Sequence, residues 1–173
     1  MMITLNSNKI NTLNQKTYNK FLTCIDFNRL SCSCGHAACL TKHGYYTRSI
    51  KSSSTQKVML TLLRVKCSIC GKTHALFPIN IVPYSGVLLE DQVTIINNYL
   101  SGKSQESLMT EKSLIDESNI SYIINNYKKY WHQRLISYSI SLNGTLETIS
   151  SQCIKLFLKQ FMQIKWVINI FII

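Results

Sequence analysis

The 173-residue sequence predicts an α+β fold, with a β-rich half followed by a mainly α-helical half. Within residues 24–88 apolar and polar side chains alternate, which is the period of a strand with one buried face. Within residues 89–165 the apolar side chains recur at i, i+3, i+4 and i+7, which is the period of an amphipathic helix. Residues 1–23 are rich in Asn, Lys and Thr without such a period, and we expect a flexible N-terminal arm or a short helix there.

Three strands are predicted in the first half. The segment 40–48 is the first, and the polar run 51–55 that follows it is typical of a turn. The chain returns through 57–66, where apolar side chains alternate with others up to the next cysteine. A third, short strand is predicted at 73–77, directly before Pro78.

Four helices are predicted in the second half, at 90–100, at 104–109, from 116 or 118 to 137, and at 146–164. The first has acidic residues at its N-terminus, where the helix dipole favours negative charge, and Gly102 where a C-cap is expected. The rhythm of the first three resembles a helix-turn-helix unit. We therefore expect the second half to be helix-turn-helix-like.

Two close pairs of cysteines are the most specific feature of the sequence. Zinc binds four thiolates in a tetrahedron, and two tight turns that each offer two thiolates meet that need. A glycine follows the second cysteine of each pair and allows a positive φ, so that backbone N–H groups can point at the sulfurs. The sequence therefore predicts a small β zinc ribbon at 24–88, with Zn²⁺ held by Cys32, Cys34, Cys67 and Cys70.

The ligand set has alternatives near the first pair. That pair is one residue shorter than the usual Cys-x-x-Cys, so Cys39, His36 or His43 is a possible replacement for one cysteine. The second pair alone has the spacing of a redox dithiol, but no thioredoxin-like βαβ pattern surrounds it. A four-cysteine metal site is the interpretation that uses both pairs.

Three further residues are interpreted as structural. Cys24 and Cys153 each have apolar neighbours, and we expect both to be buried thiols rather than ligands. His74 lies just after the second cysteine pair, and we expect it to pack beneath the ribbon.

The chain is strongly basic, with 19 Lys and Arg against 8 Asp and Glu and a formal net charge of +11. Because cations placed beside phosphates release condensed counterions, this charge favours a polyanionic partner, and we expect double-stranded DNA. The candidate phosphate contacts lie along the ribbon strands: Arg48, Lys51, Lys57, Arg64 and Lys66. A solvated sheet surface carries the same residue types, so this alternative stays open.

The third predicted helix has a polar face opposite its apolar stripe. Asn125 and Asn126 lie on this face, and asparagine can bond adenine with two hydrogen bonds in the major groove. Lys129 follows one turn later and is a candidate phosphate contact. Ordinary amphipathic packing also leaves a polar outer face, so recognition and solvation are both compatible with the pattern.

Catalysis is not expected. Two-metal nuclease chemistry needs carboxylates, and six of the eight acidic residues lie between Glu90 and Glu117, with only Asp26 and Glu147 elsewhere. No Gly-rich phosphate loop, Gly-x-Ser-x-Gly elbow or His-Glu-x-x-His motif occurs. We therefore expect neither enzymatic activity nor a small-molecule substrate.

A membrane partner is not expected either. The most apolar stretch, 154–173, is interrupted by Lys155, Lys159 and Lys165, and its longest charge-free run falls short of the ~20 residues that a membrane span needs. No charged-then-apolar leader opens the chain. We expect a cytoplasmic protein, and the sequence leaves its oligomeric state open.

Several motifs together resemble a known family. They are Cys-Ser-Cys-Gly-His at 32–36, Lys-His-Gly-Tyr-Tyr-Thr-Arg at 42–48, Cys-Gly-Lys-Thr-His-Ala-Leu at 70–76 and Val-Pro-Tyr-Ser at 82–85. In this combination the chain resembles DUF6431, a bacterial family of unknown function that is similar to the N-terminal zinc ribbons of transposases. The resemblance implies a metal-binding ribbon, a helical half and a link to mobile elements, and it implies no catalysis.

The last residues depart from that resemblance. After Lys165 the family leads us to expect a polar, proline-bearing end, whereas residues 166–173 are almost entirely apolar. We interpret this apolar tail as aberrant, in the manner of a shifted reading frame.

Two functions are compatible with these features. The leading hypothesis is a zinc-binding, DNA-binding protein related to transposase N-terminal regions, without catalytic activity of its own. The alternative is a zinc-stabilised protein–protein interaction module, in which Tyr45, Tyr46, Tyr84 and the helical stripes contact a partner.

Overall fold

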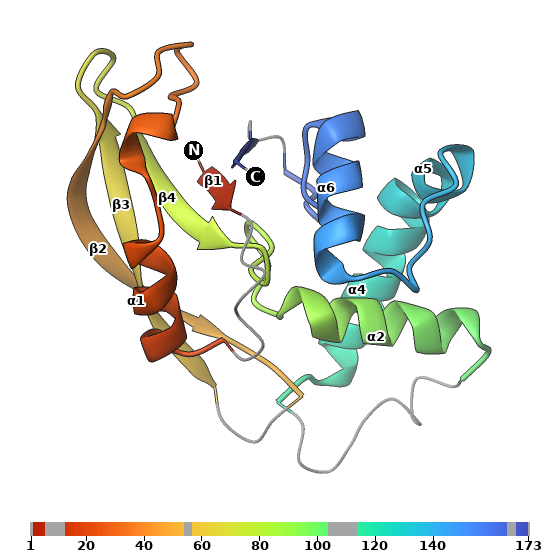
Figure 1. The fold of residues 1–173 in the computed structure, drawn as a ribbon. Coiled ribbons are helices and arrows are strands. Elements are labelled where there is room, and N and C mark those ends of the chain that lie inside the picture. Colours follow the sequence, from red (N-terminus) through yellow and green to blue (C-terminus); the bar gives the residue numbers. More distant parts are fainter. Residues whose placement is uncertain (1, 6–12, 54–56, 104–113, 166–168, 173) are drawn as a thin grey trace.

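The computed structural model describes residues 2–5, 13–53, 57–103, 114–165 and 169–172. A five-stranded sheet with the order β2-β3-β4-β1-β5 lies beside a group of helices that forms the other half of the molecule (Figure 1). The α+β fold class predicted from the sequence is confirmed.

The predicted strands of the first half are present. The strands of the sheet are β1 (Met2–Leu5), β2 (Leu40–Ile50), β3 (Val58–Cys67), β4 (Thr73–Pro78) and β5 (Asn169–Ile172). β2, β3 and β4 pair in antiparallel fashion, whereas β1 is parallel to both β4 and β5. β2, β3 and β4 each match a predicted strand to within two residues at either end.

The N-terminal segment, for which we expected a flexible arm or a short helix, forms β1 and helix α1 (Gln15–Thr23). β1 lies between β4 and β5, so the first and last strands of the chain are neighbours in the sheet (Figure 1). Asn14 accepts a hydrogen bond from the N–H of Thr17, whose hydroxyl accepts one from the N–H of Asn14, and this capping box fixes where α1 begins.

Helix α1 is tied to the sheet by a buried tyrosine. The Tyr18 hydroxyl donates to the carbonyl of Leu76 and accepts from the N–H of Leu63, both at 3.0 Å. The Tyr18 hydroxyl is therefore a hydrogen-bond partner for backbone groups of both β3 and β4. Helix α1 covers one face of the sheet (Figure 1).

The helical region contains α2 (Leu89–Leu100), α4 (Glu117–Asn126), the π-helical segment η2 (Tyr127–Trp131), α5 (His132–Ser137) and α6 (Leu146–Phe157), and the short 3₁₀ helix η1 (Phe27–Arg29) precedes the sheet. α4, η2 and α5 follow one another without a break, which confirms the helix predicted to end at 137. The helix predicted at 104–109 lies outside the described residues, so the helix-turn-helix arrangement stays a prediction. In the described part of the chain, no helix has the length and apolar character that a membrane crossing requires.

Helix α6 ends earlier than predicted. We expected it to reach residue 164, but it stops at Phe157, and Leu158 takes a left-handed conformation with φ 55°. The chain then turns so that Gln160 and Phe161 are fully buried. The Gln160 amide donates to the Ile79 carbonyl at 2.5 Å, and this tertiary contact outweighs the helical periodicity of the segment.

The buried side chains form two clusters, which we call the sheet core and the helical core. The sheet core combines apolar residues of β2, β3 and β4 with Ile3, Tyr18 and Phe21 from the N-terminal segment. The helical core surrounds Trp131, which is fully buried and meets the ring of Phe161 edge-on at 5.3 Å. We call the parts of the chain around these cores the sheet half and the helical half.

A lysine joins the two halves. Lys51 follows β2, and its ammonium group lies 2.8 Å from an Asp116 carboxylate oxygen and 2.8 Å from the Asn119 side-chain oxygen, at the N-terminus of α4. Its backbone N–H also donates to the carbonyl of Gly86 at 2.7 Å. The end of β2 is therefore fixed against both α4 and the loop before α2.

Candidate metal centre

The first cysteine pair lies in a short turn. The N–H of Cys32 donates to the carbonyl of His36 at 2.8 Å, and the N–H of Gly35 donates to the carbonyl of Cys32 at 3.0 Å. Gly35 has φ 90°, a conformation that side chains other than glycine rarely adopt. The glycine is therefore needed to close the turn.

The second pair lies in a turn with the same pattern. The N–H of Cys67 donates to the carbonyl of Lys72 at 2.9 Å, the N–H of Gly71 donates to the carbonyl of Cys67 at 3.0 Å, and Gly71 has φ 72°. Both turns are closed by an outer and an inner hydrogen bond, and the first simply has one residue fewer. The short spacing of the first pair is therefore compatible with a paired site.

The two turns place four sulfur atoms together. The Sγ atoms of Cys32, Cys34, Cys67 and Cys70 all lie within 4.8 Å of one another. Two contacts cross between the turns, Cys32 to Cys70 at 3.5 Å and Cys34 to Cys67 at 3.8 Å. Tetrahedral coordination with metal–sulfur bonds of ~2.3 Å separates the sulfurs by ~3.8 Å. The four predicted cysteines can thus hold a metal ion, and we call them the four-cysteine cluster.

The thiols of the cluster differ in acidity. The N–H of Cys70 donates to the sulfur of Cys67 at 3.4 Å and lowers the pKa of Cys67 to about 6. A hydrogen bond from Lys72 lowers the pKa of Cys70, but burial and the neighbouring thiols outweigh it and raise that pKa to about 11. Adjacent thiolates repel one another, so all four sulfurs ionise together only when a cation shares their charge.

The proposed replacement ligands lie in different places. Cys39 is buried, with its sulfur 3.4 Å from that of Cys67 and 3.1 Å from the carbonyl oxygen of His36. The His36 Nδ1 atom lies 3.4 Å from the sulfur of Cys34. His43 occupies an irregularity in β2 and is exposed. Cys39 and His36 therefore flank the four-cysteine cluster, and His43 faces solvent.

His74 is buried, as we expected of a histidine packed beneath the ribbon. Its Nε2 atom lies 3.2 Å from the sulfur of Cys32. Burial lowers the pKa of His74 to about 4, so the ring is neutral near pH 7 and can donate one N–H to the sulfur. Such a donor orients a metal ligand from outside the coordination shell.

The two remaining cysteines behave differently from each other. Cys153 is fully buried, and burial raises its pKa to about 12, as expected for a structural thiol. Our expectation for Cys24 is wrong, since its side chain is exposed. Cys24 forms the C-cap of α1, so the apolar residues beside it in sequence point into the core while it does not.

Two of the candidate phosphate contacts are occupied by contacts within the chain. The Arg48 guanidinium is partly buried, lies 5.3 Å from the Phe77 ring and donates to the carbonyls of Val82 and Ser85. Lys51 is engaged at the N-terminus of α4. Both side chains hold loops in place, so neither presents an unengaged cation at the surface.

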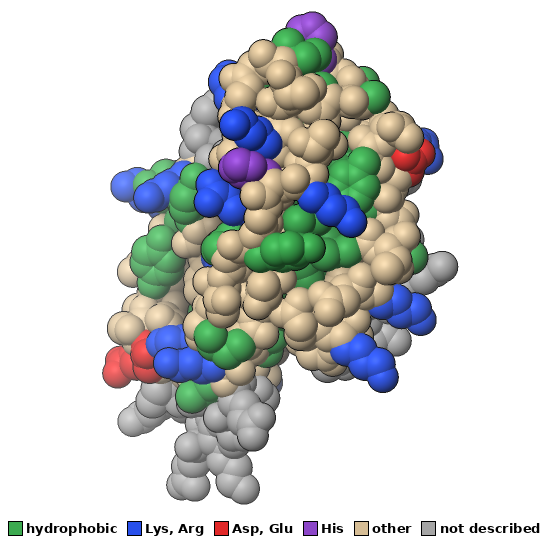
Figure 2. Space-filling view, turned by 90° about the vertical axis from the view of Figure 1, so that its left-hand side faces the viewer, with side chains coloured by type: hydrophobic (Ala, Val, Ile, Leu, Met, Phe, Trp, Pro, Cys, Tyr) green, Lys and Arg blue, Asp and Glu red, His purple; other side chains and the backbone are tan. Residues whose placement is uncertain are grey.

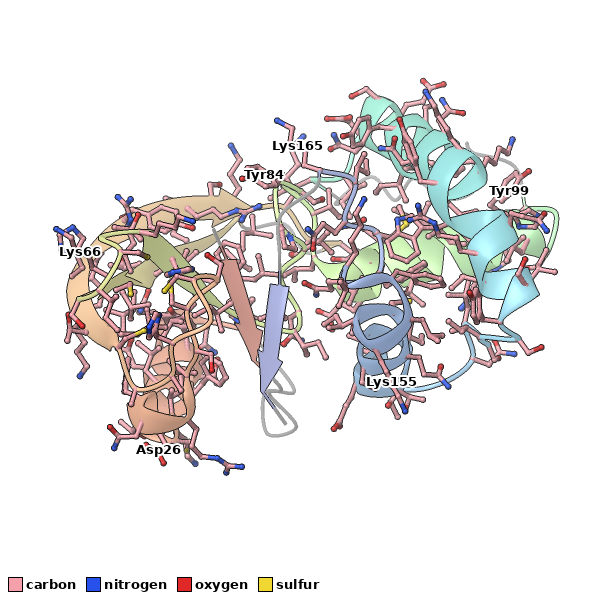
Figure 3. The ribbon with its side chains drawn as sticks, turned by 90° about the horizontal axis from the view of Figure 1, so that it is seen from above. Asp26, Lys66, Tyr84, Tyr99, Lys155 and Lys165 are labelled. Atoms are coloured by element: carbon pink, nitrogen blue, oxygen red, sulfur yellow. The ribbon has the colours of Figure 1, made fainter. Side chains whose placement is uncertain are left out.

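The other three strand candidates are exposed. Lys57, Arg64 and Lys66 lie at or along β3 with exposed side chains, and Arg64 donates to the Thr73 hydroxyl at 3.2 Å. The side of the molecule in Figure 2 carries Lys and Arg side chains around exposed hydrophobic ones. In Figure 3, Lys66 lies at the end of the sheet half, and Lys165 lies on the opposite edge of the molecule from Asp26 and Lys155.

The helical candidates divide into two groups. Asn125 and Lys129 are exposed on the helix formed by α4 and η2. Asn126 is partly buried and lines a pocket instead of the outer face. Tyr84 and Lys165 line the same pocket. Tyr84 was expected to contact a partner only in the interaction-module alternative, and Lys165 was not a candidate site residue. The motif Val-Pro-Tyr-Ser at 82–85 was a sequence signal at this place.

The comparisons with known proteins give one match. A family model described as "Domain of unknown function (DUF6431)" matches residues 31–120. The matched span contains both cysteine turns, β2 to β4 and α2, and it ends within α4. The searches of curated proteins and of solved structures found no match.

Proposed function

The chain belongs to the DUF6431 family, and from this premise we propose that it is a zinc-binding, DNA-binding protein related to transposase N-terminal regions. The observation that carries the proposal is the four-cysteine cluster, whose sulfurs lie within 4.8 Å of one another. The proposal assigns the protein a binding role and no catalytic step.

The chemistry of the donor atoms favours zinc. Four thiolates are soft ligands, and a tetrahedral set of sulfurs is typical of structural zinc sites. The site is closed, because all four donors come from the chain and no position is left for a substrate or water. A zinc ion here would join the turn before β2 to the turn between β3 and β4.

The metal can be tested with two cysteine variants. Cys70→Ser removes a member of the four-cysteine cluster, whereas Cys39→Ser removes a thiol that lies beside the cluster. We expect one zinc per chain in the reduced wild type and in Cys39→Ser, and loss of zinc in Cys70→Ser, as measured by elemental analysis. Absence of zinc from the wild type would contradict the proposal. Loss of zinc only in Cys39→Ser would show that Cys39 is a ligand.

The distribution of charge favours DNA as the partner. The formal net charge is +11, and residues 1–89 contain one acidic residue, Asp26. Lys57, Arg64 and Lys66 are exposed at β3, and Arg64 and Lys66, two residues apart, lie on the same face of that strand. Exposed cations on one side of a sheet can follow a phosphate backbone.

The DNA partner can be tested by salt-dependent binding. Arg64→Gln removes one of these cations, and Lys155→Gln is the matched control, because Lys155 is an exposed lysine of α6, in the helical half. If Arg64 contacts a phosphate, its loss should weaken binding to all duplexes and lower the slope of log affinity against log salt by about 1. Lys155→Gln should leave that slope nearly unchanged. A wild type that binds no duplex at low salt would refute the proposal.

The alternative function also has a structural basis. The large apolar side chains exposed in the helical half include Leu100, Ile136, Tyr138, Leu156 and Leu158. Exposed apolar groups of this size are typical of protein interfaces when they are contiguous. A stable stoichiometric protein complex that forms without DNA, and that is lost on Ile136→Ser, would favour the interaction module.

A further inference from the structure

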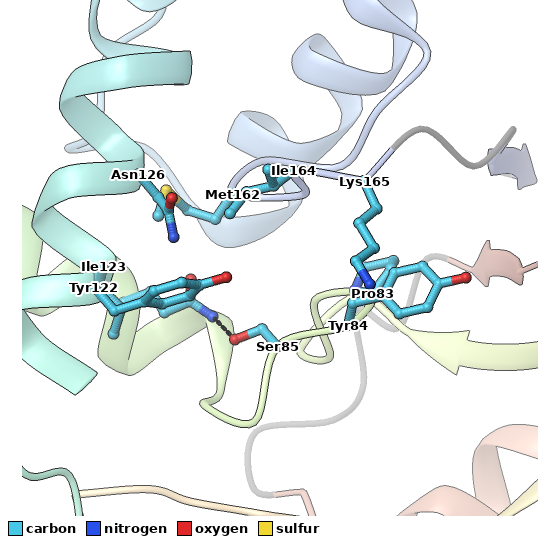
Figure 4. Close-up of a pocket in the computed structure, with 10 residues that line it drawn as sticks. Pro83, Tyr84, Ser85, Tyr122, Ile123, Asn126, Met162, Ile164 and Lys165 are labelled. Atoms are coloured by element: carbon cyan, nitrogen blue, oxygen red, sulfur yellow. Dashed lines mark hydrogen bonds between the residues drawn. The ribbon is translucent and has the colours of Figure 1, made fainter. Parts of the chain in front are cut away.

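A pocket of about 280 Å³ lies outside the metal centre, between the turn at 82–85, helix α4 and the segment 162–165 (Figure 4). Figure 4 shows the side chains of α4 on one side of this pocket and Tyr84 with Lys165 on the other. We call it the α4 pocket. Its lining includes Tyr84, Tyr122, Asn126, Met162 and Lys165.

Two walls of the α4 pocket have an unusual backbone. In the turn from Val82 to Ser85 the third residue, Tyr84, has φ 62°, and the N–H of Ser85 donates to the carbonyl of Val82 at 3.1 Å. The turn from Gln160 to Gln163 repeats this arrangement, with Met162 at φ 64°. This position of a turn usually holds glycine, and residues with side chains persist there at functional sites. Both left-handed residues line the same pocket.

The first of these turns is held from behind. Arg48 donates to the carbonyls of Val82 and Ser85, and the Gln92 amide donates to the Ser85 hydroxyl at 3.0 Å (Figure 4). The wall that carries Tyr84 is therefore fixed before any ligand arrives. A preformed wall of this kind is typical of a binding pocket.

The polar groups of the α4 pocket are suited to a ligand with acceptor atoms. The side-chain amide nitrogen of Asn126 is buried and has no hydrogen-bond partner among the described residues. The ammonium group of Lys165 lies 5.1 Å from the centre of the Tyr84 ring. None of the described residues that line the pocket is acidic. The pocket thus offers a buried donor and a cation, and two exposed tyrosine rings, Tyr84 and Tyr122.

We propose that the α4 pocket binds one unpaired nucleotide of a DNA strand. A nucleotide combines the three features that the lining requires, namely a flat ring for the tyrosines, acceptor atoms for Asn126 and a negative charge for Lys165. The volume of about 280 Å³ is at the small end for ligand pockets and suits a single base. This inference rests on the proposed DNA binding and deepens it, since it makes an unpaired base the preferred feature.

The test compares three duplexes of equal length, one fully paired, one with a single bulged nucleotide and one with an abasic bulge. We expect the wild type to bind the bulged duplex about tenfold more tightly than the paired one, as stacking of one base on an aromatic ring predicts. The abasic bulge should lose this preference, because it bends the duplex without supplying a base. A free deoxynucleoside monophosphate should compete only weakly, since it lacks the flanking phosphates.

Adjacent asparagines supply a matched pair of variants. Asn126→Asp replaces the buried donor with an acceptor and adds a negative charge inside the pocket, whereas Asn125→Asp adds the same charge on the exposed face. Asn126→Asp should abolish the preference for the bulge, and Asn125→Asp should retain it. Lys165→Gln, at an exposed residue, should reduce the preference without affecting the fold, with Lys155→Gln as its control.

The outcomes separate this inference from the proposed function. If the wild type binds all three duplexes equally, or if both asparagine variants behave alike, the α4 pocket is not a nucleotide site and the DNA-binding proposal stands. If the free mononucleotide binds as tightly as the bulged duplex, the pocket is a site for small nucleotides and the inference is wrong. If no duplex binds at low salt, both proposals are wrong.

Discussion

The sheet half and the helical half are stabilised by different means. The sheet half combines a hydrophobic core with the four-cysteine cluster. The cluster brings together the turn before β2 and the turn between β3 and β4. The helical half depends on apolar packing around Trp131, and its one cysteine, Cys153, is a buried thiol. Agents that act on sulfur and metal should therefore affect one half, and substitutions in the helical core should affect the other.

The comparison also revises the expected role of the metal. From the sequence alone, residues 24–83 offer only a thin core, and metal binding is expected to contribute much of their stability. In the structure, Ile3, Tyr18 and Phe21 add to that core from outside this range. The metal should therefore stabilise the cysteine turns more than the whole sheet.

Removal of the metal should have the largest effect. A structural zinc ion contributes roughly 10 to 16 kcal/mol to the folding of isolated zinc-finger peptides, and part of that should be lost around 32–39 and 67–74. We expect faster amide hydrogen exchange in these two segments after chelation, and unchanged exchange in α2, α4 and α6. Adding zinc back should restore the protection. Equal loss of protection in both halves would show that both halves depend on the metal to the same extent.

The second largest effect is expected in the helical core. Trp131 is fully buried, so Trp131→Ala should lower the free energy of unfolding by about 3 to 5 kcal/mol through a cavity beside Phe157 and Phe161. Denaturant titration measures this, and Ile136→Ala at an exposed position is the control. The zinc content should not change in either variant. Loss of zinc in Trp131→Ala would contradict the independence of the two halves.

A smaller effect is expected where α1 meets the sheet. Tyr18→Phe removes the hydroxyl that joins the Leu63 N–H and the Leu76 carbonyl, and leaving these buried groups without that partner should cost about 1 to 3 kcal/mol. Tyr122→Phe, at an exposed hydroxyl, should change the unfolding free energy very little. Equal stability of the two variants would mean that α1 contributes less to the sheet than its hydrogen bonds indicate.

The features predicted well from the sequence are those encoded by local pattern. β2 and β3 are long strands separated by a polar turn, and β3 runs up to a cysteine of the second pair, so their ends were placed to within two residues. The four cysteines were identified because tight spacing and glycine position are properties of a few neighbouring residues. The capping box of Asn14 and Thr17 was a further local signal, and it could have located α1.

The features that were missed depend on distant contacts. β1 has four residues, too few for a readable period, and it exists through pairing with β4 and β5. Arg48 and Lys51 have the composition of surface cations, yet their partners are carbonyls and an acid far along the chain. The end of α6 depends on the burial of Gln160 against Ile79. None of these partners is visible in a sequence window.

The smallest predicted effect concerns the link between the two halves. One carboxylate oxygen of Asp116 accepts the Asn119 N–H at 2.9 Å and caps α4, and the other lies 2.8 Å from the Lys51 ammonium group. The hydrogen bond from Lys51, followed by that from Ser118, holds the pKa of Asp116 well below its usual range. The native state therefore favours the ionised carboxylate more than the unfolded chain does. The resulting stabilisation of the native state is fully present when the pH is above the pKa of this carboxyl group in the unfolded chain, about 3.9. It is lost as the pH falls toward the lower pKa of the group in the native state.

Two variants separate the charge of Asp116 from its capping role. Asp116→Asn keeps a capping side chain and removes the charge, whereas Asp116→Ala removes both. We expect melting temperatures in the order wild type, Asp116→Asn, Asp116→Ala near neutral pH. The difference between wild type and Asp116→Asn should shrink as the pH falls from about 7 to about 3, because the wild-type carboxylate then loses its advantage. The group is exposed, so this difference should be small and should shrink further in high salt. A difference that does not change with pH or salt would show that the carboxylate acts only as a helix cap, and that Lys51 does not couple the sheet half to α4 through charge.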